Sequence, residues 1–245
     1  MPLQEELENQ GNFLFRYRGS IPLLILVAAI LVFARQSRFI EIDQWYFFLC
    51  FGISILGLLI RIGTVGFTPK NTSGRNTKEQ IADEINTTGI YSTVRHPLYV
   101  GNFVMWLGAA LLTHHLWFIL FFVAFYWIYY ERIMFAEEQF LRKKFGVPYL
   151  EWAGKTPAFI PSLQSYIAPR YPFSLKKVLR REVNGLLNIF IVFTFFDLIY
   201  HYIKTSAFGI HRYFWIGGVI VSLVVYLVLK LVSKNTTALD ETGRI

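Results

Sequence analysis

The sequence predicts an all-α protein, a polytopic membrane bundle of five or six spans with a cofactor pocket at its cytoplasmic face. Of its 245 residues, 54% are hydrophobic and 18% aromatic but only 16% are charged, which is unusual for a soluble domain. Six apolar runs also approach the roughly 20 residues that cross a bilayer. These runs cover residues 19–34, 45–62, 98–113, 116–134, 186–203 and 213–232, and the first and third are short.

The distribution of basic residues is the next observation that supports this prediction. With the N-terminus placed in the cytoplasm, twenty Lys and Arg residues fall in inside segments and four in outside segments, namely Arg35, Arg38, Lys204 and Arg212. By the positive-inside rule, we expect both termini to face the cytoplasm from the inner membrane. The net charge of +8 then belongs to a face beside anionic lipid, so we expect no nucleic acid among the partners.

The N-terminal segment and the cysteine content carry further expectations. The stretch MPLQEELENQGNF is acidic and polar, and no clear small-residue cleavage site follows the first apolar run. We therefore expect no signal peptide and a first span that is retained. The single cysteine, Cys50, lies inside an apolar run, which excludes a disulfide framework.

Composition divides the chain into four segments. Residues 1–62 form N-terminal membrane helices, and residues 63–97 form a polar cytoplasmic connector. Residues 98–161 form the core, and residues 162–245 contain a basic linker and a C-terminal pair of membrane helices. Within the connector, the capping-box pattern at residues 77–80 predicts the start of a short helix.

The core opens with a helical hairpin from Pro97 to Met134. The turn at residues 113–115 is so short that its two helices must pack antiparallel. Pro97 is typical of a first helical position. After the hairpin, residues 131–145 predict a helix that leaves the membrane and ends at Gly146, followed by another helix from Pro148.

Four charged or titratable side chains meet at the open end of this hairpin. Arg95 and His96 precede its first helix, and Glu137 and Glu138 follow the membrane part of its second. Because the hairpin returns the chain to its starting face, we expect these side chains to converge. A purely structural interpretation remains open, in which Arg95 extends to lipid phosphate and His96 caps the helix.

Three residues of the first hairpin helix extend this predicted cluster. Tyr99 and Asn102 share one helix face with Arg95 if the helix begins a turn early, since the spacing is i, i+4, i+7. Gly101 would let another backbone or a flat ligand approach closely.

Four features follow one another in the core: RHPLYVGN, a short hairpin, AEEQFLRKKFG and YLEWAGKTPAFIP. In this order they resemble the isoprenylcysteine carboxyl methyltransferase and phospholipid methyltransferase superfamily. The resemblance spans residues 87–161, about a third of the chain. It implies a membrane enzyme that binds S-adenosylmethionine at the cytoplasmic surface. The cofactor-binding residues that it implies are Arg95, His96, Tyr99, Gly101, Glu137 and Glu138. We add Asn102 to this set because it would share a helix face with Arg95 and Tyr99. Lys155 falls where the prenylcysteine enzymes have a basic residue near the substrate.

The chemistry of this cofactor agrees with the resemblance. S-adenosylmethionine carries an ammonium, a sulfonium and a carboxylate, which Glu137 or Glu138 and His96 or Arg95 would satisfy. Methyl transfer to an ionised oxygen needs no general base, so the enzyme chiefly positions the acceptor in line with the methyl group. We expect Arg95 or Lys155 to hold an anionic acceptor, and both are therefore our candidate catalytic residues.

The methyl acceptor stays open at the level of sequence. The chain departs from the prenylcysteine enzymes in its lead-in GRNTKEQIADEINTTGIYS and in its extra C-terminal spans. It is similar overall to bacterial lipid A phosphate O-methyltransferases, which makes a lipid A 1-phosphate the first expectation. An isoprenylcysteine carboxylate and the amine of phosphatidylethanolamine are the alternatives.

Two weaker interpretations concern other polar residues. A small membrane transporter would use Asp197 and His201 as central polar groups, but the sequence has no inverted repeat to support it. His114 and His115 are adjacent and therefore point apart, so we expect no metal site.

Overall fold

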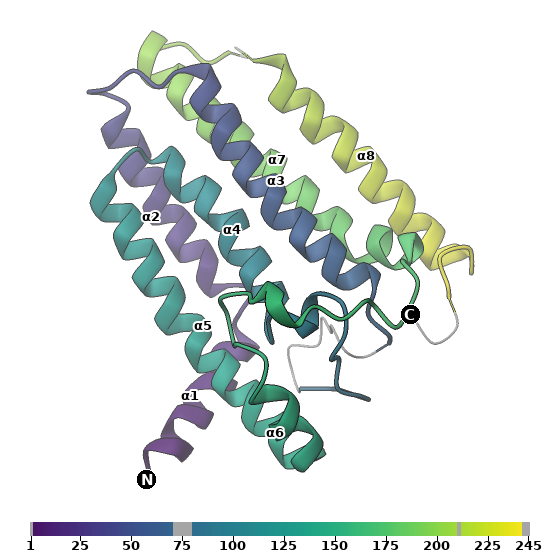
Figure 1. Ribbon diagram of the computed structural model, residues 1–245. Coiled ribbons are helices and arrows are strands. Elements are labelled where there is room, and N and C mark those ends of the chain that lie inside the picture. The colour runs from purple at the N-terminus through teal and green to yellow at the C-terminus, as the bar shows by residue number, and fades with distance from the viewer. Residues whose placement is uncertain (1, 71–79, 210–211, 242–245) are drawn as a thin grey trace.

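The computed structural model is all-helical over the residues that it describes, which are 2–70, 80–209 and 212–241. Figure 1 shows the longer helices side by side in a bundle, with the shorter helices at one end. The helices are α1 (Leu3–Arg16), α2 (Ile21–Gln36), α3 (Gln44–Gly66), α4 (Pro97–Leu112), α5 (Leu116–Phe145), α6 (Val147–Ala153), α7 (Leu175–Thr205) and α8 (Tyr213–Asn235). Two 3₁₀ turns, η1 (Ile90–Ser92) and η2 (Leu163–Ser165), lie in the loops.

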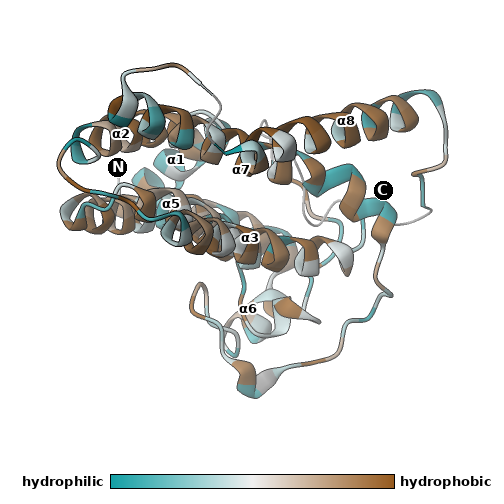
Figure 2. Ribbon diagram, turned by 90° about the horizontal axis from the view of Figure 1, so that it is seen from above, coloured by the Kyte–Doolittle hydropathy of each residue, from teal (hydrophilic) through white to brown (hydrophobic). Residues whose placement is uncertain are grey.

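The structure confirms the predicted membrane class and refines the count of spans. Within the described residues, α3, α5, α7 and α8 are each long and apolar enough to cross a bilayer. A fifth span arises if α1 and α2, which meet at 71°, are counted together. Helix α4 is apolar but has only 16 residues. Figure 2 shows the long helices mostly in the hydrophobic colour, with hydrophilic colour gathered at their ends.

Local sequence signals set the ends of the hairpin helices as predicted. Pro97 is the first residue of α4, where it needs no backbone partner for its missing N–H. The side chain of His115 accepts a hydrogen bond from the Phe118 N–H and so caps the start of α5. Gly146 ends α5 with a φ of 60°, a conformation that favours glycine. The hairpin therefore places Pro97 and the C-terminal turns of α5 at the same end of the bundle (Figure 1).

Small residues bring α3 and α4 into direct backbone contact. A Cβ atom added to Gly57 would lie 2.4 Å from the backbone nitrogen of Met105. One added to Gly101 would lie 2.9 Å from the carbonyl oxygen of Gly57. Gly108 packs in the same way against α3. This face of α4 is therefore closed by α3, and Gly101 serves helix packing at this position.

The helix predicted within the connector differs from the structure. Its start at residues 77–79 lies outside the described residues, and residues 80–89 contain no helix. Instead, this segment is held by other elements: Gly89 forms an antiparallel bridge with Ile167, and the Lys144 side chain donates to the Ala82 carbonyl. Tertiary contacts therefore hold parts of residues 80–89 in place of helical hydrogen bonds.

Helix α1 lies along the polar end of α5. Lys143 pairs with Glu8 at 2.6 Å, and Gln4 donates to Gln139 at 3.1 Å. The backbones also approach closely, since a Cβ on Gly11 would lie 2.1 Å from the Arg132 carbonyl oxygen. Helix α7 packs against α3 and α8. These contacts leave one end of the bundle ringed by α1, α5, α6 and the connector.

Candidate active site

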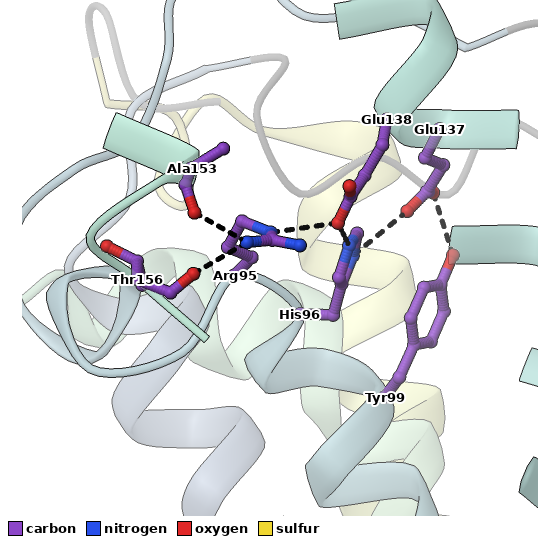
Figure 3. Close-up of polar contacts among 7 residues, drawn as sticks. All are labelled: Arg95, His96, Tyr99, Glu137, Glu138, Ala153 and Thr156. Carbon is purple, nitrogen blue, oxygen red and sulfur yellow. Dashed lines mark hydrogen bonds and ion pairs between the residues drawn. The ribbon is translucent and has the colours of Figure 1, made fainter. Parts of the chain in front are cut away.

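Two carboxylates of α5 face the residues that precede and open α4. Nε2 of His96 lies 3.0 Å from a Glu138 oxygen, and Nδ1 lies 3.5 Å from a Glu137 oxygen. The Tyr99 hydroxyl donates to the other Glu137 oxygen at 2.7 Å. Figure 3 shows these side chains pointing toward one another across the open end of the hairpin. The predicted convergence of the hairpin ends is therefore present, although the two carboxylates have different partners.

Arg95 is fixed by the segment that follows α6. Its Nε donates to Glu138 at 2.8 Å, and its Nη1 donates to the carbonyls of Ala153 and Thr156, both at 2.7 Å. The Arg95 backbone N–H also donates to the Pro157 carbonyl at 2.9 Å. The helix begins only at Pro97, so the expectation that Arg95 shares a helix face with Tyr99 and Asn102 was wrong. The non-helical backbone at Arg95 turns its side chain toward the α6 segment instead.

Burial and the two carboxylates shift the pKa of the His96 imidazole in opposite directions. The residue is only 7% exposed. Burial alone would lower the pKa of its imidazole. Hydrogen bonds and charges from Glu137 and Glu138 outweigh that effect and raise the pKa above the usual value. Because each ring nitrogen faces a carboxylate, the doubly protonated ring suits this position.

A cavity of about 670 Å³ opens beside this cluster and extends between α4 and α7. Most of the predicted site residues line it, while three do not. Gly101 packs against α3, Glu138 lies behind Arg95 and His96, and Lys155 is exposed at the surface. The lining residues from the predicted set are Arg95, His96, Tyr99, Asn102 and Glu137, and Trp106 also lines the cavity.

Aromatic side chains form the wall of the cavity beside Tyr99. The Tyr99 and Tyr130 ring centroids are 4.7 Å apart, and those of Tyr126 and Tyr130 are 4.2 Å apart. The Tyr126 hydroxyl donates to the Tyr99 carbonyl at 2.8 Å. These contacts hold Tyr99 in place, and with it the hydroxyl that donates a hydrogen bond to Glu137.

An ion pair between α3 and α7 is a part of the cavity that the sequence analysis missed. Arg61 donates to both oxygens of Glu182 at 2.8 Å and to the Asn102 side-chain oxygen at 2.7 Å. Glu182 is 4% exposed. The signal was present in the sequence, since both charges lie at the margins of apolar runs, where ionisable residues usually have a partner or a function.

The N-terminal helices supply further cavity residues that were not predicted. Phe15 and Arg18 line the cavity from the bend between α1 and α2, and the Arg18 guanidinium lies 3.8 Å from the centroid of the Phe15 ring. The packing of α1 against α5, together with contacts of α2 with α4, α5 and α7, brings this bend to the cavity.

The residues considered for transport and metal binding lie elsewhere. Asp197 pairs with Arg212 at 3.0 Å, away from the cavity lining. Within the described residues, no group of three or more His, Cys, Asp or Glu side chains is arranged to hold a metal ion.

Comparison with known proteins gives the family of the chain. Residues 22–147 match the phospholipid methyltransferase family. The chain is 29% identical over 158 residues to the nickel-cobalt-cadmium resistance protein NccN of Alcaligenes xylosoxydans xylosoxydans, covering 63% of this chain and 70% of that protein. It is 31% identical over 159 residues to the cobalt-zinc-cadmium resistance protein CzcN of Cupriavidus metallidurans, covering 63% and 68%.

An enzyme with a named reaction is also similar to part of the chain. The protein-S-isoprenylcysteine O-methyltransferase of Schizosaccharomyces pombe is 37% identical over 75 residues, covering 31% of this chain and 32% of that protein. No solved structure shows significant similarity to the chain. The family match covers half of the sequence and includes the hairpin with its Arg-His and Glu-Glu pairs, so the chain belongs to the phospholipid methyltransferase family and is a multi-pass membrane methyltransferase.

Proposed function

We propose that this protein transfers a methyl group from S-adenosylmethionine to an anionic group of a membrane lipid, with a lipid A 1-phosphate as the first candidate acceptor. The observation that carries the proposal is the position of Glu137. Its carboxylate lines the cavity, oriented by the Tyr99 hydroxyl on one side and by His96 on the other. A carboxylate held in this way suits the ammonium of the cofactor.

The polar cluster gives each charged part of S-adenosylmethionine a suitable partner. Methyltransferases of this family generally use this cofactor, which supplies an activated methyl group when it is bound. Arg95 lines the cavity as a donor for its carboxylate, while Glu138 pairs with both Arg95 and His96 and keeps them oriented. Tyr99 and Trp106 offer aromatic surface beside them for the adenine.

The acceptor oxygen needs positioning rather than deprotonation, because a phosphate or carboxylate is already ionised at neutral pH. Arg95 belongs to the lining and is our candidate for orienting the anion. Lys155 is exposed and outside the lining, so we assign no step to it. Membrane lipid is a suitable acceptor because the cavity continues between helices that are apolar enough to lie in a bilayer.

A second candidate acceptor is the carboxylate of an isoprenylcysteine. The similarity to the isoprenylcysteine methyltransferase covers 75 residues and favours this alternative. In both cases we propose that the Glu137 end of the bundle faces the cytoplasm, which the excess of basic residues at that end supports.

Two measurements test the proposal. Titration of S-adenosylmethionine into the full chain in detergent should give saturable binding, and folded protein without binding would contradict the cofactor assignment. Mass spectrometry should then compare lipids from cells with and without the protein. A methyl-sized increase on lipid A is expected, whereas a methylated prenylcysteine or ethanolamine headgroup would replace the first candidate acceptor.

A further inference from the structure

The cavity extends well beyond the Glu137 cluster along one face of α7. Its lining on α7 runs from Arg181 to Phe193, a stretch of thirteen residues that covers about 18 Å along a helix. Arg181, Asn184 and Asn188 occupy the polar part of this face at i, i+3 and i+7. Ile189, Val192 and Phe193 line the part deeper in the bundle. This wall, which we call the α7 wall, consists of lining residues 181–193, and it lies outside the segment 22–147 that matches the family.

The lining of α4 shows the same change from polar to apolar. Tyr99 and Asn102 line the cavity near the Glu137 cluster, and Met105, Trp106 and Ala109 line it further along the helix. A polar ligand such as S-adenosylmethionine accounts for the first part but not for the apolar part. A cavity with both parts fits an amphiphile whose headgroup lies near the cluster and whose tail lies between α4 and α7.

Asn188 indicates which kind of ligand group the polar part of the α7 wall can bind. It is exposed on a helix that is apolar enough to cross a membrane. Its side chain and that of Asn184 both line the cavity. An amide at this place can hydrogen-bond a polar group of a ligand through its oxygen or its two N–H groups.

Arg61 supplies a fixed cation next to these amides. Glu182 and Asn102 accept three hydrogen bonds from its guanidinium, which carries five N–H groups. The remaining two N–H groups can donate to a ligand, since the side chain is 21% exposed and lines the cavity. The ion pair with Glu182 and the hydrogen bond to Asn102 hold it in one orientation between α3, α4 and α7.

We infer that the α7 wall binds the methyl acceptor and selects an anionic oxygen over an amine, through Asn184, Asn188 and Arg61. This inference rests on the proposed methyl transfer. The wall offers guanidinium and amide N–H donors, which complement a phosphate or carboxylate. A protonated amine would instead meet Arg61 and Arg181, while the Glu182 carboxylate in the same lining is already engaged by both of its oxygens with Arg61.

The reaction balances without a proton acceptor. A lone pair of the anionic oxygen forms the new O–CH₃ bond, while the electron pair of the breaking C–S bond stays on sulfur. The sulfonium becomes a neutral sulfide, and the acceptor oxygen loses its negative charge on becoming an ester. A wall that donates hydrogen bonds to the other oxygens of the acceptor leaves the attacking oxygen ionised.

The test uses Asn188→Asp in the full-length protein, purified in detergent and assayed with S-adenosylmethionine and phosphatidylcholine vesicles. Separate vesicles carry lipid A, a farnesylcysteine or phosphatidylethanolamine, which present a phosphate monoester, a carboxylate and an amine. The new carboxylate should repel an anionic acceptor and raise its KM about tenfold or more. Affinity for S-adenosylmethionine, measured by titration, should not change. Asn235→Asp makes the same chemical change at the exposed end of α8, outside the cavity, and should leave both values unchanged.

Each arm has a result that decides the inference. Methylation of lipid A or of the farnesylcysteine alone supports it and identifies the anion. Methylation of phosphatidylethanolamine alone overturns the selection of an anionic oxygen while the methyl transfer itself stands. An unchanged KM in Asn188→Asp, or a loss of cofactor affinity, overturns the assignment of the α7 wall. If that variant does not fold, Asn184→Asp is held to the same expectations. Wild-type protein that binds no S-adenosylmethionine overturns the proposed function and the inference together.

Discussion

Tyr99 and Glu137 lie on opposite helices of the hairpin, and the Tyr99 hydroxyl donates to the Glu137 carboxylate at 2.7 Å. Glu138, its neighbour in sequence, instead pairs with Arg95 at 2.8 Å. The two carboxylates therefore differ in role: Glu137 faces the cavity and Glu138 orients the residues that line it.

This difference predicts distinct effects for two matched variants. Glu137→Gln keeps an acceptor for the Tyr99 hydroxyl but removes the charge, so affinity for S-adenosylmethionine should fall by about 2 kcal/mol, about thirtyfold. Glu138→Gln leaves the half-buried Arg95 without its ionic partner and should chiefly lower thermal stability. Titration and thermal unfolding measure the two effects.

The control for this pair is Glu151→Gln, since Glu151 is exposed on α6 and outside the cavity lining. It should match the wild type in both measurements. Weaker cofactor binding in Glu138→Gln than in Glu137→Gln would reverse the assigned roles.

The environment of His96 predicts a pH-dependent stability. Glu137 and Glu138 raise the pKa of His96 above its usual value of 6.5. A group whose pKa is raised on folding stabilises the folded state fully below its unfolded pKa, and this contribution is lost as the pH rises through the folded value. The wild type should therefore exceed His96→Gln in Tm most at about pH 6 and progressively less toward about pH 9. A difference in Tm that is constant or grows with pH would contradict the ion pair.

The close approach of α3 and α4 predicts a stability effect far from the charged cluster. In Gly57→Ala, the new Cβ would lie 2.4 Å from the Met105 backbone nitrogen, so the two helices must separate. We expect a loss of about 2 kcal/mol or more in unfolding free energy. Gly52→Ala on the same helix is the control, because its Cβ would meet nothing within 4 Å. Equal unfolding midpoints for the two variants would argue against the packing of α3 on α4.

The orientation in the membrane can be tested with single cysteines. Cys50 is buried, so a Cys50→Ala background removes the natural thiol, and Gln164→Cys and Phe208→Cys add exposed thiols at opposite ends of the bundle. In intact cells, an impermeant maleimide should label the thiol at position 208 and not that at 164, because the end with more basic residues faces the cytoplasm. The opposite labelling pattern would invert the proposed topology.

The sequence by itself determined the membrane helices and the gathering of polar side chains at the open end of the hairpin. The apolar runs, the start of α4 at Pro97 and the end of α5 at Gly146 were predicted from the sequence, and the structure confirms them. They could be predicted because they depend on local solvation and on the backbone preferences of single residues. The short turn between α4 and α5 was also enough to predict that Arg95 and His96 would lie near the Glu-Glu pair, since an antiparallel hairpin must bring its two ends together.

Only the tertiary structure decided which side chains meet within that region. Neither the division of roles between Glu137 and Glu138 nor the pairing of Arg61 with Glu182 follows from spacing along the chain. Such contacts depend on how each helix is rotated and at what depth it packs against its neighbours. The glycine contacts between α3 and α4 help set that geometry, together with the loop carbonyls that draw Arg95 away from α4. These determinants act between residues far apart in sequence, which is why local patterns could not predict them.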